Sequence, residues 1–214
     1  NIANVNTAGF KASRVIFQDL YSQTLSSASA PVGTTQGGTN PKQVGLGVSI
    51  AAIDVLHTNS ATQYTGAELD FAIEGDGFFA LTNGTDMFYT RAGALVLDRD
   101  FDPILENIVI SPNYYGITVD KNGVIVGIDK VTGDRDILGQ VALATFPNER
   151  GLEKNGQNTY IVSGNSGDPT YVAPDSAGAG ALVSGSLEMS NVDLTNEFSD
   201  MIVTQRGFQA NSRI

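Results

Sequence analysis

Short runs of alternating apolar residues recur along most of the chain, and they predict a fold built mainly from β-strands. In segments 44–50, 69–73 and 115–119, every second residue is Val, Leu, Ile, Phe or Tyr. Similar runs follow at 141–143 and 160–162. A period of two places these side chains on one face of a half-buried strand. The expected fold class is therefore mainly β.

Turn residues separate these apolar runs. Asn83 and Gly84 stand between two apolar segments, and Asn-Gly in that position is the strongest short-range signal of a β-hairpin. Asp-Lys-Asn-Gly at 120–123 and Val-Thr-Gly-Asp at 131–134 separate the next strands in the same way. Glycine makes up 24 of the 214 residues, which agrees with many turns. We expect a β-rich body over 44–190, arranged as a meander, a barrel-like sheet or a sandwich.

The segment before this body has a different composition. Residues 1–7 are typical of the frayed end of a helix or of a polar loop. Residues 15–25 are ambiguous, because their apolar residues would suit one face of a helix although the segment is short. Residues 26–43 are rich in Ser, Gly, Thr, Asn and Pro, and we expect an extended loop that acts as a linker or flexible arm. A second loop-like segment is expected at 163–181.

The C-terminal residues show the periodicity of a helix. From Leu194 onwards, apolar residues and one Gln return after three or four positions, which places them on one face. Six residues form what we call the helix stripe: Leu194, Phe198, Met201, Ile202, Gln205 and Phe208. Asp193 is placed to cap the first turn, which also contains Asn196 and Glu197.

The helix stripe needs a partner, because each buried Leu, Phe or Met side chain contributes about 1.5–3 kcal/mol. It could pack on the β body as a core helix, or pair with another helix along a coiled-coil seam. No capping signal ends it, so we expect the helix to continue beyond residue 214 and material to be missing at both ends. The predicted division is an N-terminal helix end, arm and linker at 1–43, the body at 44–190, and the C-terminal helix at 191–214.

The charge of the chain argues against nucleic acid and anionic membranes as partners. Asp and Glu outnumber Lys and Arg by 23 to 12, giving a formal net charge of −11. The basic residues are scattered singly, whereas proteins that bind phosphate groups usually carry a basic patch. No apolar run approaches ~18 residues, so no transmembrane helix is expected. The sequence has no Cys, which excludes disulfides, thiolate metal sites and a cysteine nucleophile.

Candidate catalytic and metal-binding residues do not form a recognisable site. His57 is the only histidine, and a lone His at the end of an apolar strand is more often structural than catalytic. Three aspartates, Asp98, Asp100 and Asp102, resemble the start of a calcium loop. The positions that require Gly and Glu in such a loop are occupied by Pro103 and Val109. A glycosidase needs a pair of carboxylates, and the candidates are Glu74, Asp76, Glu106 and Glu188. None of them has a visible reason for a perturbed pKa. We expect no enzymatic activity, cofactor, metal or small-molecule substrate.

Five segments resemble the motifs of a known family. NIANVNTAGFKASR at 1–14 resembles the N-terminal signature of the bacterial flagellar rod and hook axial proteins, and residues 190–213 resemble their C-terminal signature. Residues 69–81, 89–98 and 138–160 are similar to motifs of the family's body. The residues that carry the resemblance are Asn1, Asn4, Asn6, Gly9, Phe10, Gly75, Gly77, Phe78, Phe79, Tyr89, Arg91, Gly93, Ser190, Asn191, Arg206 and Asn211.

Within this family, residues 17–31 and 37–50 resemble the hook protein, which is the preferred interpretation, and the distal rod protein is the alternative. The chain has no room for the extra β domains that longer hook proteins insert. Asp102-Pro103 stands where the family usually has Gly, which keeps the rod alternative open.

The resemblance implies a mechanical function. Many copies polymerise into a helical tube, a flexible universal joint that carries torque from motor to filament, and the terminal helices pair in its innermost layer. The implied partners are further copies of the chain and other axial proteins, namely those of the rod, the hook cap and the hook–filament junction. The implied location is extracellular, in the hook and basal body of the flagellum. A hypothesis of another class is an extracellular ligand-binding β module, which would need a concave aromatic site.

Overall fold

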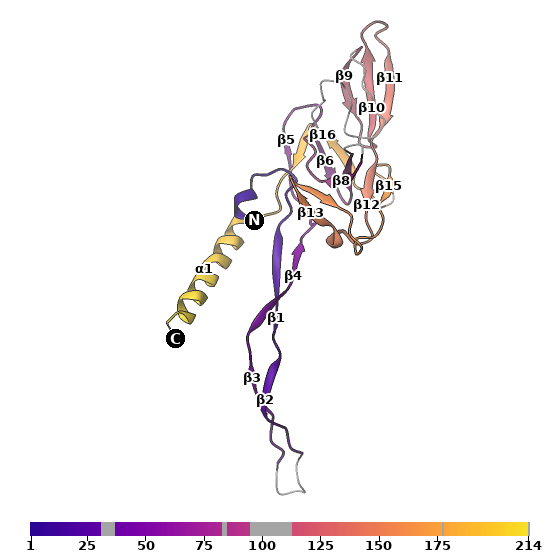
Figure 1. Cartoon of the computed structure of the whole chain (residues 1–214). Helices are drawn as coiled ribbons and strands as arrows, with labels where there is room; N and C mark the ends of the chain where they lie inside the picture. Colours follow the sequence, from indigo (N-terminus) through magenta and orange to yellow (C-terminus); the bar gives the residue numbers. More distant parts are fainter. Residues whose placement is uncertain (31–36, 83–84, 95–112, 177, 214) are drawn as a thin grey trace. The chain divides into compact units, whose positions relative to one another are not determined.

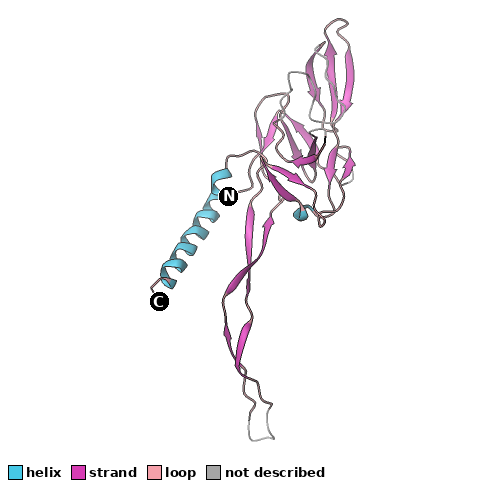
Figure 2. Ribbon diagram, in the orientation of Figure 1, coloured by secondary structure: helices cyan, strands magenta, loops and turns pink. Residues whose placement is uncertain are grey.

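The computed structural model describes residues 1–30, 37–82, 85–94, 113–176 and 178–213. Within these residues the fold is mainly β, with one α-helix near the C-terminus (Figure 2). The predicted fold class is confirmed. No helix in the described ranges combines the length and hydropathy that crossing a membrane would require.

The chain forms two compact units. The smaller spans Ser13–Val55, and the larger combines Asn1–Ala12 with Leu56–Ile214. These boundaries differ from the predicted one between residues 43 and 44. The three-part division of the sequence stays a prediction, because compactness alone does not test which parts fold independently.

The smaller unit is a long antiparallel ribbon of two chain segments (Figure 1). β1 (Ser13–Asp19) pairs with β4 (Val48–Val55), and β2 (Ser22–Ser26) pairs with β3 (Lys42–Gly45). The helical face considered for residues 15–25 is therefore not formed. These residues find hydrogen-bonding partners in a distant segment, and such pairing overrides a weak local preference for helix.

The prediction of a loop over 26–43 is wrong at both of its ends. Ser26 belongs to β2 and Lys42 to β3, and an isolated bridge joins Ser29 to Thr39. The Ser29 and Thr39 hydroxyls also lie 2.8 Å apart, within hydrogen-bonding distance. Composition indicated a loop because Ser, Thr and Asn favour turns, but the same residues can pair when a facing strand supplies partners.

The largest sheet of the larger unit has six antiparallel strands in the described residues, in the order β13-β14-β8-β7-β12-β15. Its strands are β7 (Phe78–Thr82), β8 (Met87–Thr90), β12 (Leu143–Thr145), β13 (Glu153–Gly156), β14 (Thr159–Ile161) and β15 (Thr170–Val172). Part of the loop predicted at 163–181 is thus a strand, because β15 pairs with the edge of β12.

Smaller sheets accompany it. One has three strands in the order β11-β10-β9, and two pairs of strands are β16 with β6 and β17 with β5. Their bounds are β5 (Thr62–Tyr64), β6 (Phe71–Glu74), β9 (Tyr114–Val119), β10 (Val124–Asp129), β11 (Arg135–Gln140), β16 (Ala181–Ser184) and β17 (Ser186–Glu188). Within the described part of the chain these sheets do not close into a barrel, so the sandwich-like arrangement fits best among the predicted ones.

The predicted hairpin between β7 and β8 is present. The two strands pair antiparallel with Thr82 opposite Met87, while Asn83 and Gly84 lie outside the described residues. The turns predicted at 120–123 and 131–134 also form, and each contains a glycine with positive φ, Gly123 at +77° and Gly133 at +75°.

Apolar residues from several strands form the core of the larger unit. They belong to β6, β7, β9, β10, β12, β16 and the segment before β12: Phe71, Ile73, Phe79, Val119, Ile125, Val141, Leu143 and Leu182. The helical segments lie outside this core: η1 (Ile2–Asn4), η2 (Glu149–Gly151) and α1 (Leu194–Asn211).

Candidate functional site: the terminal junction and two exposed apolar surfaces

The N-terminal segment, the β body and the segment leading into α1 meet at a cluster of buried charges, which we call the terminal junction. It contains Lys11, Arg91 and Glu188, and each side chain is at most 1% exposed. Lys11 Nζ lies 2.6 Å from Glu188 Oε1, and Arg91 Nη1 lies 3.6 Å from Glu188 Oε2. A single carboxylate therefore pairs with two cations.

Backbone carbonyls accept further hydrogen bonds from these cations. Lys11 Nζ donates to Thr58 O at 2.8 Å, and Arg91 Nη1 donates to Gly75 O at 2.8 Å. The Arg91 guanidinium also lies 5.2 Å from the centre of the Phe78 ring, a distance suited to a cation–π interaction. Burial lowers the pKa of Lys11, because removal from water penalises the charged ammonium. Loss of Glu188 would leave two buried cations without a carboxylate partner, so the cluster favours one arrangement of the three segments.

Asn191 makes a second connection at the terminal junction. Its Oδ1 accepts a hydrogen bond from Ala12 N at 2.7 Å. Its Nδ2 donates to Leu56 O at 2.8 Å and to Thr58 Oγ1 at 2.9 Å. One side chain thereby joins the N-terminal segment, the residues around Leu56 and the approach to α1.

Two glycines allow backbones to approach closely beside the charges. Gly9 has φ +68°, and a Cβ on it would lie 2.5 Å from Ala92 N. A Cβ on Gly93 would lie 1.7 Å from Phe71 O. Because real side chains do not reach such distances, both positions require glycine. Gly9 N also donates to Glu188 O at 2.8 Å, which places the N-terminal segment directly against β17.

His57 packs at the terminal junction as an uncharged ring. Its centre lies 5.4 Å from that of Phe78 and 5.3 Å from that of Tyr160, both in edge-on geometry. Burial, with the neighbouring cations Lys11 and Arg91, lowers the pKa of His57 to about 4. The imidazole is therefore neutral at pH 7, and its contacts are those of a packing residue.

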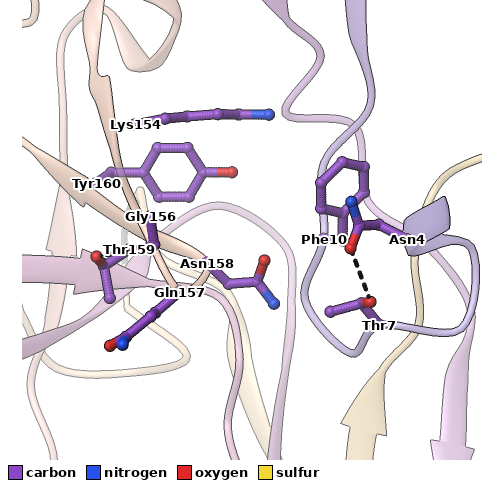
Figure 3. A pocket seen from close by; sticks show the side chains of 9 residues that line it. All are labelled: Asn4, Thr7, Phe10, Lys154, Gly156, Gln157, Asn158, Thr159 and Tyr160. Carbon is purple, nitrogen blue, oxygen red and sulfur yellow. Dashed lines mark hydrogen bonds between the residues drawn. The ribbon is translucent and has the colours of Figure 1, made fainter.

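A groove runs beside the terminal junction, between the N-terminal segment and the β13–β14 hairpin (Figure 3). It has a volume of about 480 Å³. Lys154 Nζ lies 4.9 Å from the centre of the Phe10 ring and donates to Lys11 O at 3.2 Å. Asn158 Nδ2 donates to Ala8 O at 3.2 Å. These contacts hold the N-terminal segment against the hairpin.

The helix stripe is exposed on α1. Asp193 Oδ1 accepts a hydrogen bond from Thr195 N at 2.8 Å, which confirms the predicted N-cap. No described residue of α1 is buried, so the alternative of a core helix packed on the β body is wrong. The exposed fraction of its apolar residues runs from 39% at Leu194 to 75% at Phe208. That α1 uses this stripe to bind a partner stays a prediction.

A second exposed apolar surface lies on the β1–β4 ribbon, and we call it the ribbon face. Val15 pairs with Ile53 and Phe17 with Ile50, and directly opposite residues share one face of a strand pair. All four side chains are exposed, Phe17 at 63%. The opposite face of the ribbon is mixed. Gln18 Nε2 donates to Ser49 Oγ at 3.3 Å and Arg14 lies 3.9 Å from Asp54, while Ile16 faces Ala52 between these two polar pairs.

The residues singled out from the sequence fall into separate groups. Several family-motif residues meet at the terminal junction or the groove: Asn4, Gly9, Phe10, Gly75, Phe78, Arg91, Gly93 and Asn191. Phe79 and Tyr89 are buried in the β body, whereas Arg206 and Asn211 lie on α1. Of the candidate carboxylates, Glu74 and Asp76 are exposed and Glu188 is an ion-pair partner.

The calcium-loop residues, Asp98 to Val109, and Glu106 lie outside the described residues. Among the residues that are described, no group of His, Asp and Glu is arranged to hold a metal ion.

Lys11 was not identified from the sequence as a site residue. It follows Phe10 within the first motif, and a lysine inside a segment with few charges is the signal that could have drawn attention to it. Its partner Glu188 is 177 positions away, so periodicity could not connect the two.

Family models match two parts of the chain. The model described as the C-terminal region of the flagellar basal body rod FlgEFG proteins matches residues 183–214. The model described as the flagellar hook protein FlgE/F/G D1 domain matches residues 72–127. The first match covers α1 with its helix stripe, and the second begins within β6.

Curated relatives match over the whole chain. The flagellar basal-body rod protein FlgG of Bacillus subtilis is 49% identical over 225 residues, which cover 100% of this chain and 85% of the relative. The chain belongs to the flagellar rod and hook axial protein family. FlgG of Borreliella burgdorferi is 38% identical, with 100% of this chain and 84% of the relative covered. The flagellar hook protein FlgE of the same organism is 28% identical over 403 residues, which cover 100% and 91%.

These relatives revise the preference between hook and rod. The axial protein resembles the rod protein FlgG more strongly than the hook protein FlgE, by 49% against 28% identity. The preferred interpretation of a short hook protein is therefore less well supported than the distal rod alternative. Axial proteins of this family are structural and not enzymes, in agreement with the expectation from the sequence.

Proposed function

We propose that this axial protein is a subunit of the distal rod of the flagellar basal body, and that many copies assemble into a helical tube that transmits torque. The observation that supports this proposal most strongly is the 49% identity to the Bacillus subtilis rod protein over the entire chain. Because the rod lies in the periplasm, this proposal replaces the expected extracellular location with a periplasmic one. Its partners would be further copies and neighbouring axial proteins.

A tube that grows by identical steps needs contacts between different surfaces of successive subunits. The helix stripe and the ribbon face are suitable surfaces, since both present apolar side chains to solvent. Burial of each such side chain contributes about 1.5–3 kcal/mol. The stripe would be covered by other terminal helices, and the ribbon face by a neighbouring copy.

The distribution of charge supports the ribbon face as a contact surface. Residues 13–55 contain two basic and two acidic side chains, Arg14, Lys42, Asp19 and Asp54, so their net charge is zero. The chain as a whole carries −11, which therefore resides entirely outside the ribbon. A neutral apolar surface can be buried against another copy without the like-charge repulsion that the rest of the chain would cause.

The terminal junction supports the proposal from inside the subunit. Torque passes along a tube only if the terminal helices and the outer β body move as one. The ion cluster of Lys11, Arg91 and Glu188 and the hydrogen bonds of Asn191 connect these parts through buried contacts.

The hook remains the second candidate, because the hook protein FlgE is also similar over the entire chain. Electron microscopy of tubes assembled from the full-length protein separates the candidates. Straight rigid tubes would support the rod, and curved or coiled tubes would support the hook.

A genetic measurement tests the same point in the cell. The full-length protein should restore swimming to Bacillus subtilis lacking its FlgG and should fail to replace that cell's hook protein. Restoration of the hook mutant alone would overturn the rod assignment. If neither tubes nor restoration are found, polymerisation itself is rejected in favour of a ligand-binding module.

A further inference from the structure

The two ring nitrogens of His57 are buried without hydrogen-bond partners among the described residues. The ring packs edge-on against Phe78 of β7 and Tyr160 of β14. A neutral imidazole tolerates such a position, whereas an imidazolium has two N–H donors that both need acceptors. Protonation in place would therefore create a buried charge whose donors have no acceptor.

Charged groups from every neighbouring segment face His57, and most of them are cations. The nearby cations are Lys11 of the N-terminal segment, Arg91 after β8, Arg150 of η2 and Lys154 of β13. The carboxylates of the same cluster are Glu188 of β17, which pairs with two cations, and Glu149 of η2, which interacts with Lys11. A proton on His57 would add a further positive charge to this cluster.

We propose that the terminal junction is an acid-sensitive latch, in which protonation of His57 releases residues 1–12 and the approach to α1 from the β body. The closed latch contains neutral His57 and the Lys11–Glu188–Arg91 cluster. The open latch exposes His57 to water, where it can hold a proton at little cost. This inference concerns the subunit's own contacts and holds for a rod or a hook subunit alike.

The direction of the pH effect follows from the two states. In the closed latch the pKa of His57 is lowered from 6.5 to about 4, and in the open latch it returns to its ordinary value. Well above pH 7 neither state is protonated, so the equilibrium does not change with pH. Between pH 6.5 and 4 the open state takes up the proton first, which favours opening by up to roughly 300-fold.

The effects of two other titratable groups on the pH dependence must be distinguished from the effect of His57. Burial raises the pKa of Glu149, so acid protonates Glu149 more readily in the closed state and opposes opening. Burial lowers the pKa of Lys11, so loss of its proton as the pH rises favours the closed state. Variants of His57 are therefore the decisive comparison.

The first measurement is the NMR titration of His57. Because it is the only histidine, its Cε1–H signal needs no assignment. We expect a midpoint near pH 4 in the folded chain and near 6.5 in urea. A midpoint near 6.5 in the folded chain, with the junction still closed, would overturn the proposal.

The second measurement reports opening of the latch directly. The chain has no Cys, so Ala12→Cys, at a position 7% exposed within the junction, supplies a single thiol. Its rate of reaction with dithiodipyridine is divided by that of Val131→Cys, a position 85% exposed, which removes the pH dependence of the thiol chemistry. We expect this ratio to rise by one to two orders of magnitude between pH 7 and pH 4. The rise should be smaller than the maximum of roughly 300-fold for His57 alone, because protonation of Glu149 opposes opening.

His57→Phe and His57→Gln serve as the matched controls, since neither side chain titrates. In either background the acid-induced rise should disappear, while reaction at pH 7 stays slow if the junction still closes. Two variants are used so that a folding defect in one leaves the other informative. An unchanged ratio in the original chain, or an equal rise in both variants, would reject the latch.

Discussion

At the scale of single residues, the terminal junction combines charges and close backbone contacts that leave little freedom for substitution. Lys11 and Glu188 are fully enclosed, and Gly93 has backbone atoms where a side chain would lie. Substitution of Lys11 or Glu188 would change the free energy of unfolding through electrostatics. Substitution of Gly93 would change it through steric conflict.

Lys11→Met should destabilise the protein strongly. It removes the closer cation from Glu188 and leaves Arg91, at 3.6 Å, and the Ser60 N–H, at 3.1 Å, as its partners. Breaking a buried ion pair costs up to about 3–5 kcal/mol. Lys121→Met is the matched control, because Lys121 Nζ lies 2.8 Å from Asp175 Oδ2 but both side chains are substantially exposed, and exposed pairs contribute little. Urea unfolding followed by circular dichroism compares the two. Equal midpoints would show that burial does not make the Lys11 pair important.

Gly93→Ala should prevent folding or lower the free energy of unfolding by at least ~3 kcal/mol, a loss typical of severe steric conflict. The new Cβ would lie 1.7 Å from Phe71 O, and this backbone atom cannot move without disturbing β6. Gly164→Ala is the control, since a Cβ there has open space and no positive φ is recorded. If both variants unfold at the same urea concentration, the close approach at Gly93 is not a real constraint.

At the scale of elements, α1 and the β1–β4 ribbon share one property, an apolar surface exposed to solvent. The helix stripe returns every three to four residues, whereas the ribbon face uses opposite pairs such as Phe17 and Ile50. The 3.6-residue period of the helix gathers the stripe on one side of α1, and the two-residue period of a strand gathers the ribbon face on one side of the ribbon. Both would be stabilised by burial against other chains.

Phe198→Asp in the full-length protein should abolish tube formation while leaving the β body folded, because a carboxylate in a buried helix seam loses its hydration. Phe208→Asp should act in the same way. Val203→Asp is the matched control, since the helical period places Val203 opposite the stripe; it should reduce assembly much less. Sedimentation measures tube yield and circular dichroism the fold. Normal yield from Phe198→Asp and Phe208→Asp would remove the stripe from the assembly mechanism.

At the scale of the whole molecule, net charge opposes assembly. Each copy carries a formal charge of −11, so copies brought together in a tube repel one another through the acidic larger unit. Raising NaCl from about 0.1 M to 1 M shortens the screening length from about 10 Å to about 3 Å. Assembly of the full-length protein should therefore begin at a lower protein concentration in high salt, as measured by light scattering. A higher threshold in 1 M NaCl would show that attractive ion pairs between copies outweigh the repulsion.

Local patterns in the sequence determined the type of most elements. Alternation predicted strands β6, β9, β12 and β14, the Asn83-Gly84 pair predicted the β7–β8 hairpin, and Asp193 predicted where α1 begins. The half-buried strand expected at 44–50 is instead divided between β3 and β4, and its apolar residues are exposed. The motifs at the two ends also indicated the family. All of these signals depend on residues a few positions apart, because turns, caps and strand faces form among sequence neighbours.

Only the tertiary structure decided which distant residues meet. Residues 15–25 became strands because β4 and β3 pair with them, and the loop expected at 26–43 became part of the same ribbon at its ends. Lys11 and Glu188 form the centre of the terminal junction across 177 positions. Pairing at this separation is set by the free energy of burying many groups together, a quantity that no local period or composition contains.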